Sequence, residues 1–314
     1  MECLVTGAGG FVGRGVIEAL AAAGHGGIAT GRSAPRHLPP GWVGRERGAI
    51  LAAPATAGIG VIVHLEVLQD GAGDAAALER VNVGGTAEWL EWAARGGIAR
   101  VVFMSSMLAV AARGGPILED APPATGDSYG ATKARAEAAV RAWAAWPGRG
   151  AVILRAAPVY APEAGSNLLA LVRRVRAGRP VLLGRGEALR SVVSRRNLAA
   201  AVLFALSGPG GCEVYNVADP RPLPMRELAA TVAELAGAPP PRALPEWLAT
   251  AAAPLGTLCG WMTGWTPPVT LARLRELRTE VDVRCDRLVA AGYRHPETTR
   301  EGLAALVAYV TRGG

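Results

Sequence analysis

The stretch Thr6-Gly7-Ala8-Gly9-Gly10-Phe11-Val12-Gly13 decides the fold that this 314-residue sequence predicts. The segment Glu2-Cys3-Leu4-Val5, which we interpret as a strand, precedes it, and a helical pattern follows it as far as Ala23. Gly7 permits a tight turn, Gly10 lets the backbone approach a pyrophosphate, and Gly13 allows close packing of the helix. The helix N-terminus then offers free N–H groups to the phosphates. A strand, a glycine-rich turn and a helix in this order predict a dinucleotide-binding unit.

Short apolar runs alternate with helical patterns through the first half of the chain. Strands are predicted over 27–30, 61–65, 100–104 and 151–154, and helices over 78–94 and 128–146. This alternation implies a parallel sheet with right-handed crossovers. After residue 160 the rhythm changes to helices near 166–178, 196–207, 225–236 and 299–311. We expect a doubly wound α/β Rossmann core over 1–160 and a smaller, irregular α/β substrate-binding part over 161–314, some of whose elements return to the core.

Composition and charge exclude several classes of function. Half of the residues are apolar and 19% are charged, which is typical of a globular protein. The net charge of +7 comes from scattered arginines, without a basic tail or an aromatic-interleaved basic patch, so we expect no nucleic-acid partner. The four cysteines lack metal-ligand spacing, which predicts no metal site and reduced thiols in a cytoplasmic protein.

The segment 247–272 carries no charge and has to be compared with a membrane span. It contains Pro254, Pro267 and Pro268 together with several Gly and Thr residues, whereas a span needs about 20 predominantly apolar residues. We therefore expect no membrane span. We interpret the segment as a flexible, apolar part of a substrate-binding region.

The end of the second predicted strand indicates which dinucleotide binds. An NAD site usually has an Asp or Glu there, which binds the ribose 2′-OH. Residues 19–45 contain neither, and the strand ends in Thr30-Gly31-Arg32-Ser33. Arg32 and Ser33 suit a 2′-phosphate, because charge-assisted hydrogen bonds favour an anion. We expect NADP(H), with NAD(H) as the alternative if Arg32 is only solvated.

Tyr129 and Lys133 form a second diagnostic pair. Lys133 is the only lysine in the sequence, since 32 of the 33 Lys and Arg residues are arginine. Positions i and i+4 share a helix face, so the phenol lies beside the ammonium. This charge favours phenolate and lowers the tyrosine pKa from about 10. The pair therefore predicts a proton donor or acceptor that works near neutral pH.

These motifs together resemble those of the extended short-chain dehydrogenase/reductases, the NAD-dependent epimerase/dehydratase family. The matching segments span nearly the whole chain and are 6–13, His64-Leu65, 82–86, 102–106, 129–133 and 154–160. The resemblance implies that Tyr129 exchanges a proton with a substrate oxygen, that Ser106 orients this oxygen, and that Lys133 holds the nicotinamide ribose. The cofactor-binding residues that it implies are Gly7, Gly10, Phe11, Val12, Gly13, Arg32, Ser33, Leu65, Asn82, Tyr129, Lys133, Pro158 and Val159.

The C-terminal part is similar to the nucleotide-sugar branch of this family, and closest to reductases of UDP-4-keto-6-deoxy sugars. The segments that carry this similarity are 166–169, 184–193 and Asn197-Leu198. In that branch an Asn and an Arg hold the nucleotide and its diphosphate, which implies substrate-binding roles for Asn167 and Arg190. The favoured function is 4-keto reduction of a nucleotide-activated sugar by hydride transfer.

Three positions depart from the family pattern. Glu66 and Val67 follow His64-Leu65 where small residues are usual, so Glu66 either repels the cofactor diphosphate or is a substrate-reading or catalytic group. No Asp stands between positions 48 and 57, where the third strand is expected to end, and Ala161 replaces a Gly. These differences bear on the cofactor geometry and the substrate rather than on the fold.

Other functions also fit parts of the sequence. An enzyme like 3β-hydroxysteroid dehydrogenase or dihydroflavonol reductase would use the uncharged segment 247–272 for an apolar alcohol or ketone. A sugar epimerase would reduce and reoxidise a tightly held cofactor in one cycle. A non-catalytic cofactor-binding protein is opposed by the intact Ser106, Tyr129 and Lys133.

A homodimer is also predicted. The helices expected over 78–94 and 128–146 carry Trp89, Trp92, Trp143 and Trp146. This is more bulk than one sheet face needs, and related enzymes pair these two helices in a four-helix bundle around a two-fold axis. The alternative is that all four tryptophans belong to the core of one subunit.

Overall fold

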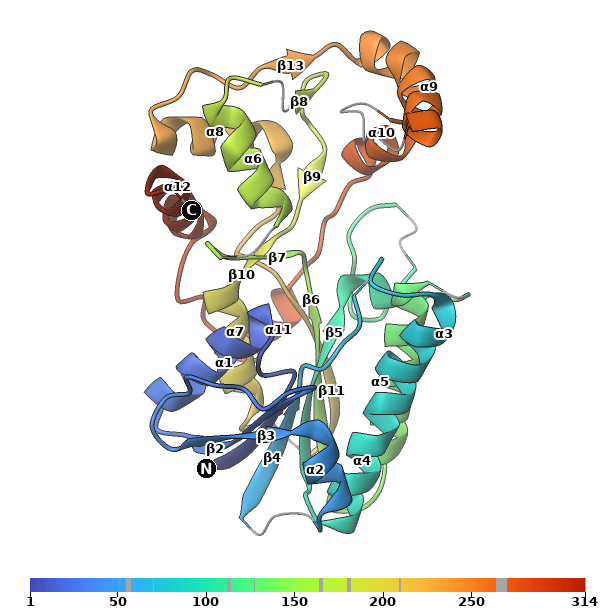
Figure 1. Ribbon diagram of the computed structural model, residues 1–314, viewed down its shortest axis with the longest axis vertical. Helices are drawn as coiled ribbons and strands as arrows, with labels where there is room; N and C mark the ends of the chain where they lie inside the picture. Colours follow the sequence, from blue (N-terminus) through green and yellow to red (C-terminus); the bar gives the residue numbers. More distant parts are fainter. Residues whose placement is uncertain are drawn as a thin grey trace.

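The computed structural model describes residues 1–54, 58–69, 71–111, 114–126, 128–163, 166–179, 182–208, 210–263 and 270–313. Its centre is a seven-stranded sheet in which every neighbouring pair is parallel (Figure 1). The strands are β1 (Glu2–Thr6), β2 (Gly26–Gly31), β3 (Trp42–Glu46), β4 (Ile59–His64), β5 (Arg100–Ser106), β6 (Gly150–Ala156) and β11 (Gly211–Val217). Their order, β11-β6-β5-β4-β1-β2-β3, confirms the predicted doubly wound α/β fold. The order reverses between β1 and β4, and ligands bind at the carboxyl ends of strands beside such a point.

Helices cover both faces of the sheet (Figure 1). One face carries α1 (Phe11–Ala22), α7 (Arg195–Ala205) and α11 (Asp286–Ala290), and the other carries α2 (Arg47–Ala52), α4 (Gly85–Arg95) and α5 (Tyr129–Ala144). Successive strand residues point to opposite faces. Val5 therefore packs with Val16 of α1 in one apolar core, while Leu4 packs with Val140 of α5 in the other.

The smaller C-terminal part lies beyond the carboxyl ends of the strands (Figure 1). Three helices, α6 (Asn167–Arg176), α8 (Met225–Ala236) and α12 (Thr299–Thr311), share a third core that includes Val172, Val232 and Leu303. Short strand pairs join it together, namely β7 (Val159–Tyr160) with β10 (Val193–Ser194), β9 (Leu189–Arg190) with β12 (Leu223–Pro224), and β8 (Leu182–Leu183) with β13 (Ala243–Leu244). The helical pair α9 (Glu246–Thr263) and α10 (Leu271–Arg278) completes it.

The chain passes between the two parts more than once after residue 160. Helix α7 packs on α1, and β11 pairs with β6 at the edge of the sheet. The buried carboxylate of Asp219 lies where the chain passes between the core and the C-terminal part. It accepts hydrogen bonds from the Tyr160 hydroxyl (2.8 Å) and from the Asn197 side chain (2.7 Å). Burial raises the pKa of this Asp219 carboxyl. These bonds fix the C-terminal part on the core.

The helix predicted over 78–94 differs from the observed structure. It is divided into α3 (Ala75–Leu78), a π-helix, η1 (Glu79–Gly84), and α4. A π-helix inside an α-helix shifts the side chains that follow it, and such segments are frequent at functional sites. Here the shift directs Asn82 at the loop that follows β4.

Among the elements that were not predicted are β3, β11 and α9. Strand β3 lies at one edge and has a single buried residue, Trp42, and β11 at the other edge begins Gly211-Cys212-Glu213, so neither has the continuous apolar run of an inner strand. Helix α9 falls in the segment expected to be flexible, where alanines favour a helix despite Pro254. Residues 264–269 of that segment lie outside the described residues.

Three of the four tryptophans on the predicted dimer helices are in the core of the subunit. Trp89 and Trp92 are 1% exposed, Trp143 is 7% exposed, and Trp146 is 65% exposed. Their bulk therefore gives no separate reason for a dimer. In the parts of the chain that the structure describes, no helix combines the length and apolar character that crossing a membrane requires.

Candidate active site

The glycine-rich turn joins β1 to α1 at the point where the strand order reverses. Gly7 has a φ of +66°, and a Cβ there would lie 2.8 Å from the backbone of Leu65 and Glu66. A Cβ on Gly13 would lie 2.4 Å from the carbonyl oxygen of Gly7. Gly10 is the N-cap of α1 and carries no side chain that could occupy the space before the helix. The turn therefore fits a pyrophosphate at the N-terminus of α1.

A buried chain of hydrogen bonds joins this turn to the end of β4. The Thr86 hydroxyl donates to the carbonyl of Asn82 (2.6 Å), so it accepts from Nε2 of His64 (3.1 Å). The other ring nitrogen, Nδ1, then accepts from the Thr6 hydroxyl (2.7 Å), which itself accepts from the backbone N–H of Leu65 (3.2 Å). Burial lowers the pKa of His64 to about 3, so the ring is neutral and structural.

Lys133 extends from α5 to the carboxyl end of β5. Its side chain is buried, donates to the carbonyl of Met104 (2.6 Å), and lies 4.2 Å from the centre of the Phe103 ring. Burial lowers the pKa of Lys133 to about 7, although the negative charge of Glu137 acts in the opposite direction. The Lys133 side chain can therefore exchange its proton near neutral pH.

Tyr129 and Ser106 stand at adjoining ends of α5 and β5. Tyr129 is the first residue of α5, and the Ser128 side chain caps this helix by accepting from Ala131 N (3.2 Å). A Cβ on Gly130 would lie 2.1 Å from the carbonyl oxygen of Leu108, so only glycine lets the helix start against the turn that follows Ser106. Gly130 was not predicted from the sequence, although its signal, a glycine directly after the tyrosine, was present.

Asn82 fastens the loop after β4 to the same helix. Its side-chain oxygen accepts from Leu68 N (2.8 Å), and its amide donates to Leu68 O (3.1 Å) and to the Thr132 hydroxyl (3.1 Å). Asn82 is 1% exposed. Its amide is thus used within the fold, where it positions the loop and the first turn of α5.

Glu66 is held by an arginine that follows β3. The Glu66 carboxylate is 3.1 Å from Nε of Arg47 and accepts from the indole N–H of Trp89 (2.9 Å). Arg47 also pairs with Glu88 (2.5 Å). The charge of Glu66 is therefore compensated from the side of β3 and α4, and the carboxylate is bound within the protein rather than unpaired beside the cofactor site.

Arg32 and Ser33 directly follow β2, and both are exposed. In the part of the chain that the structure describes, the Arg32 guanidinium has no ion-pair partner. Thr30 of β2 stands opposite Arg45 of β3, which is also exposed. This edge of the sheet presents positive charge where an adenosine ribose of a dinucleotide would lie.

Behind the site lies a buried ion pair that the sequence analysis missed. Arg155 on β6 binds Glu137 on α5 through two hydrogen bonds (2.9 and 2.7 Å), and both side chains are 4% exposed. Ser105 donates to the same carboxylate (2.6 Å). The signal was present, since Glu137 stands four residues after Lys133 on the buried side of α5.

The predicted substrate residues Asn167 and Arg190 lie on different elements, α6 and β9. Arg190 donates to the carbonyls of Leu277 (2.8 Å) and Thr279 at the end of α10. Asn167 is the exposed first residue of α6. Pro158 is exposed and Val159 half-buried, directly after the carboxyl end of β6.

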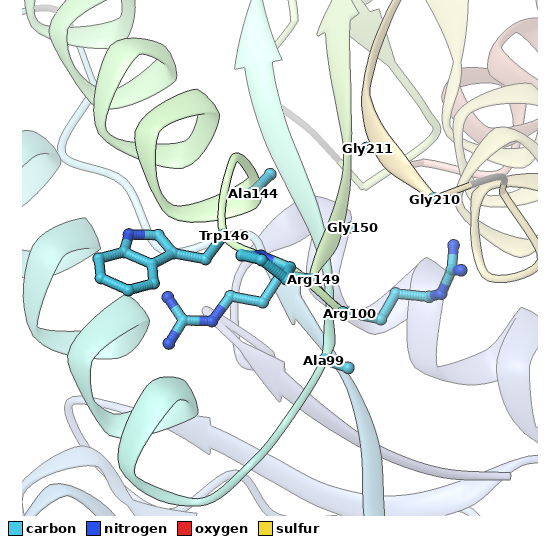
Figure 2. A pocket seen from close by; sticks show the side chains of 10 residues that line it. Ala99, Arg100, Ala144, Trp146, Arg149, Gly150, Gly210 and Gly211 are labelled. Atoms are coloured by element: carbon cyan, nitrogen blue, oxygen red, sulfur yellow. The ribbon is translucent and has the colours of Figure 1, made fainter.

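An open depression of about 430 Å³ lies among the amino ends of β5, β6 and β11, at the end of the strands opposite to the candidate active site (Figure 2). Trp146 and Arg149 line it from the turn after α5. It is remote from the glycine turn and from Lys133. In the described ranges, no three His, Cys, Asp or Glu side chains are grouped as a metal site would require.

Comparison with known proteins identifies the family. Residues 3–218 match the profile of the NAD dependent epimerase/dehydratase family. The chain belongs to this family. It is 33% identical to the 3-diazoavenalumate denitrifying reductase of a Streptomyces species, over 87% of this chain and 91% of that protein. It is 31% identical to the 2-alkyl-3-oxoalkanoate reductase of Stenotrophomonas maltophilia, over 76% and 77% of the two chains.

A solved structure of similar fold is MoeE5 in complex with UDP-glucose and NAD. It has a TM-score of 0.71 and 26% identity, and the match covers 100% of this chain and 99% of that one. The protein is therefore an enzyme of the extended short-chain dehydrogenase/reductase type, and NAD(H) is a cofactor in its family. The glycine turn and the N-terminus of α1 fit such a dinucleotide.

Proposed function

We propose that the enzyme is an NAD(P)-dependent reductase of a small-molecule carbonyl compound, with its reaction centre at the carboxyl ends of β4, β5 and β6. The observation that carries this proposal is the burial of the only lysine, Lys133, against β5, one helical turn after Tyr129. When bound, the nicotinamide supplies a hydride to the carbonyl carbon. The residues of the chain have to supply a proton and hold the substrate.

In this mechanism Tyr129 donates its phenolic proton to the carbonyl oxygen as the carbon gains the hydride, which gives the alcohol. Lys133 stabilises the phenolate that remains, because an ammonium nearby favours the charged form. The Ser106 hydroxyl binds the same oxygen and orients it. Helix α5 and strand β5 hold these groups, and Asn82 and the Glu137–Arg155 pair position α5.

The proposal includes a preference for NADP(H) over NAD(H). It is supported by the absence of Asp and Glu from residues 19–45 and by the exposed guanidinium of Arg32 directly after β2. Arg45 at the end of β3 adds a second positive charge at this edge. Both arginines would attract the 2′-phosphate of NADP(H). The 2′-hydroxyl of NAD(H) is bound better by the carboxylate of an Asp or Glu than by an arginine.

The substrate that we propose is an apolar ketone without a nucleotide. Arg190, which the sequence suggested as the diphosphate-binding residue, uses its guanidinium to bind the carbonyls at the end of α10. The relatives named above that share 31–33% identity are reductases, and one of them acts on a 2-alkyl-3-oxoalkanoate.

The 4-keto reduction of a nucleotide-activated sugar, or its epimerisation, is the second candidate. It is supported by the likeness to MoeE5, whose structure contains UDP-glucose and NAD. Asn167 is exposed at the start of α6, where it would bind a nucleotide. The two candidates differ in whether a diphosphate enters the cleft.

The experiment that tests the proposal measures turnover with NADPH and NADH on two matched sets of substrates. One set contains 2-alkyl-3-keto acids and aryl ketones, and the other contains UDP- and dTDP-4-keto sugars. We expect turnover in the first set and no competition by free UDP at millimolar concentration. Turnover of a keto sugar together with inhibition by UDP would establish the second candidate. Absence of reduction in both sets would contradict a reductase.

We further propose a homodimer in a cytoplasmic setting. The exposed sides of α4 and α5 would form the contact, and they carry charged residues such as Glu91 and Arg141. Buried thiols at Cys3 and Cys285 are consistent with a reducing compartment. Sedimentation equilibrium at micromolar concentration tests the dimer, since a mass of 32.3 kDa at all concentrations would contradict it.

A further inference from the structure

Helix α9 (Glu246–Thr263) turns small residues toward the protein and large apolar residues toward solvent. A helix at the surface of a globular protein buries its large apolar side chains and exposes polar ones. In α9 the residues that face the protein are small, with Ala249 1% and Ala253 0% exposed. The opposite side carries large apolar residues in contact with solvent.

This solvent-facing side is continuous along the helix. Trp247 is 72% exposed, Leu255 70%, Leu258 53% and Trp261 84%. Their spacing of 8, 3 and 3 residues places them within one side of an α-helix with 3.6 residues per turn. After Glu246 the helix contains no charged residue. We call these four residues the outer face of α9.

The outer face is a concentrated patch and not a scatter of single residues. Among the described residues, five of the thirteen large apolar side chains that are clearly exposed belong to α9, and two more, Leu271 and Leu277, lie on the adjoining α10. Exposed apolar patches of this kind mark interaction sites. Figure 1 shows α9 at the outer end of the C-terminal part, far from the amino ends of the sheet strands, with α10 packed beside it.

Exposed arginines surround the first turns of α9. Arg278 of α10 binds Glu246 (3.0 Å) and the Thr250 hydroxyl (2.8 Å), which brings α10 beside this end. Arg242 directly precedes β13, whose partner β8 leads to Arg185, and Arg275 is one turn before Arg278. All four arginines are exposed, and the neighbouring acidic groups Glu187, Glu246 and Glu280 compensate only part of their charge, since Glu187 also pairs with Arg226. The patch is therefore apolar with a positively charged border.

We propose that α9 is a membrane-surface helix, which lies in the interface of an anionic lipid bilayer with its outer face inserted. Tryptophans at both ends of the face suit the boundary between headgroups and acyl chains, where an indole ring is apolar and its N–H remains solvated. The arginines would bind anionic headgroups through the attraction of opposite charges near such a surface. A second copy of the chain fits less well, because a two-fold contact of α9 with α9 would bring these arginines together.

The test is flotation of the purified protein with vesicles of phosphatidylcholine alone and of phosphatidylcholine with 30% phosphatidylglycerol, a composition chosen at roughly the anionic fraction where such binding is strong. We expect the wild type to float with the anionic vesicles, to release as salt rises, and to show a blue shift of tryptophan emission on binding. The double variant Trp247→Ser/Leu258→Ser should lose at least about 10-fold in partitioning. Trp146→Ser is the matched control. Trp146 is 65% exposed, similar to Trp247, but it lies near the amino ends of the sheet strands, away from α9.

Cofactor affinity and thermal unfolding show that the variants are folded, and neither should change in the double variant. The proposal is overturned if the wild type stays with the soluble fraction at low salt, or if Trp146→Ser loses partitioning as strongly as the double variant. It is also overturned if the double variant has a smaller mass in sedimentation without vesicles, since α9 would then bind a second copy. A raised KM for a short, water-soluble ketone in that variant would assign the face to the substrate instead.

Discussion

The side-chain nitrogen of Lys133 lies 4.2 Å from the centre of the Phe103 ring. The face of an aromatic ring attracts a cation, so Phe103 favours the ammonium form of the lysine. Burial acts in the opposite direction and lowers the pKa of Lys133 to about 7. The protonation of Lys133, and so the charge that stabilises the Tyr129 phenolate, therefore depends on two opposing effects. The Phe103 ring favours the ammonium form, and burial favours the neutral amine.

The first prediction concerns the pH dependence of the rate. We expect kcat/KM for ketone reduction to fall as pH rises through about 7, because Lys133 of the free enzyme loses its proton there. Glu137→Gln removes the negative charge that raises the pKa of Lys133, so the fall should move to lower pH. The pH profiles of the two proteins, measured with saturating cofactor, check this. An unchanged midpoint in Glu137→Gln would contradict it.

The same group makes stability depend on pH in a defined direction. The folded-state pKa of Lys133 lies below the reference value of 10.5. Between about pH 7 and 10 the unfolded chain therefore binds more protons than the folded one at this site, and the site makes the free energy of unfolding increase with pH. We expect Lys133→Met to remove this contribution. Urea titrations of both proteins at pH 7 and pH 9 measure it. If the free energy of unfolding changes equally between these pH values in the two proteins, the pKa of Lys133 is not depressed.

The second prediction concerns catalysis. Tyr129→Phe removes the proton donor and should reduce kcat about 10²–10⁴-fold while cofactor affinity is kept. Lys133→Arg should be nearly as damaging, because a wide guanidinium does not fit the place of a compact ammonium against Met104. Steady-state rates and a fluorescence titration with NADPH separate the two effects. Full turnover by Tyr129→Phe would remove this residue from the mechanism.

The sequence predicted those parts of the fold that depend on local chemistry. The turn from Gly7 to Gly13 and the inner strands β4, β5 and β6 follow from glycine conformation and from continuous apolar runs. The edge strands β3 and β11 could not be predicted in this way, because half-solvated strands lack that pattern.

In the site, the positions of Tyr129 and Lys133 could be predicted from their spacing, whereas the partners of Glu66, Asn82 and Arg190 could not. Each of these three side chains binds a group that is distant in the sequence, such as Arg47, 19 residues before Glu66. Arg190 reaches the carbonyl of Leu277, 87 residues later. Only the tertiary packing brings such groups together, so a motif gives the residue type without its contacts.

The third prediction concerns the buried ion pair behind the site. Glu137→Ala leaves the guanidinium of Arg155 buried without its carboxylate and should cost about 3–5 kcal/mol of stability. The matched control is the surface pair of Arg135, which is also on α5, with Glu79 of η1, whose side chains are 41% and 47% exposed. Arg135→Ala should cost no more than about 1 kcal/mol. Chemical denaturation measures both, and similar small costs would show that the buried pair is not a stabilising link.

The double variant Glu137→Leu/Arg155→Met extends this test. Replacing both partners by apolar residues removes the unpaired charge and should recover most of the lost stability. Its activity should still be reduced, because Lys133 loses the neighbouring negative charge that raises its pKa. Recovery of stability together with full activity across the pH range would separate the ion pair from the catalytic lysine.

The fourth prediction concerns the cofactor. Arg32→Ala should weaken NADPH binding by roughly 10-fold or more and leave NADH binding nearly unchanged, because only the contact to the 2′-phosphate is lost. Arg36→Ala is a suitable control, since Arg36 is exposed in the loop after β2 but further from its end. Calorimetric titration of both cofactors checks this. A wild-type preference for NADH would sink the idea.

The fifth prediction separates two roles of Arg190. Its guanidinium binds the carbonyls of Leu277 and Thr279, which the C-terminus of α10 would otherwise leave without partners. Arg190→Ala should therefore speed proteolytic cleavage near residue 279 and lower the melting temperature slightly, with KM for an apolar ketone raised only a few-fold. Arg190→Lys should recover part of this, because an ammonium reaches one carbonyl but not both in the fork geometry of arginine. If Arg190 instead binds a diphosphate, then Arg190→Ala would leave proteolysis near residue 279 unchanged and would abolish binding of UDP, and this outcome would favour the nucleotide-sugar candidate over the apolar ketone.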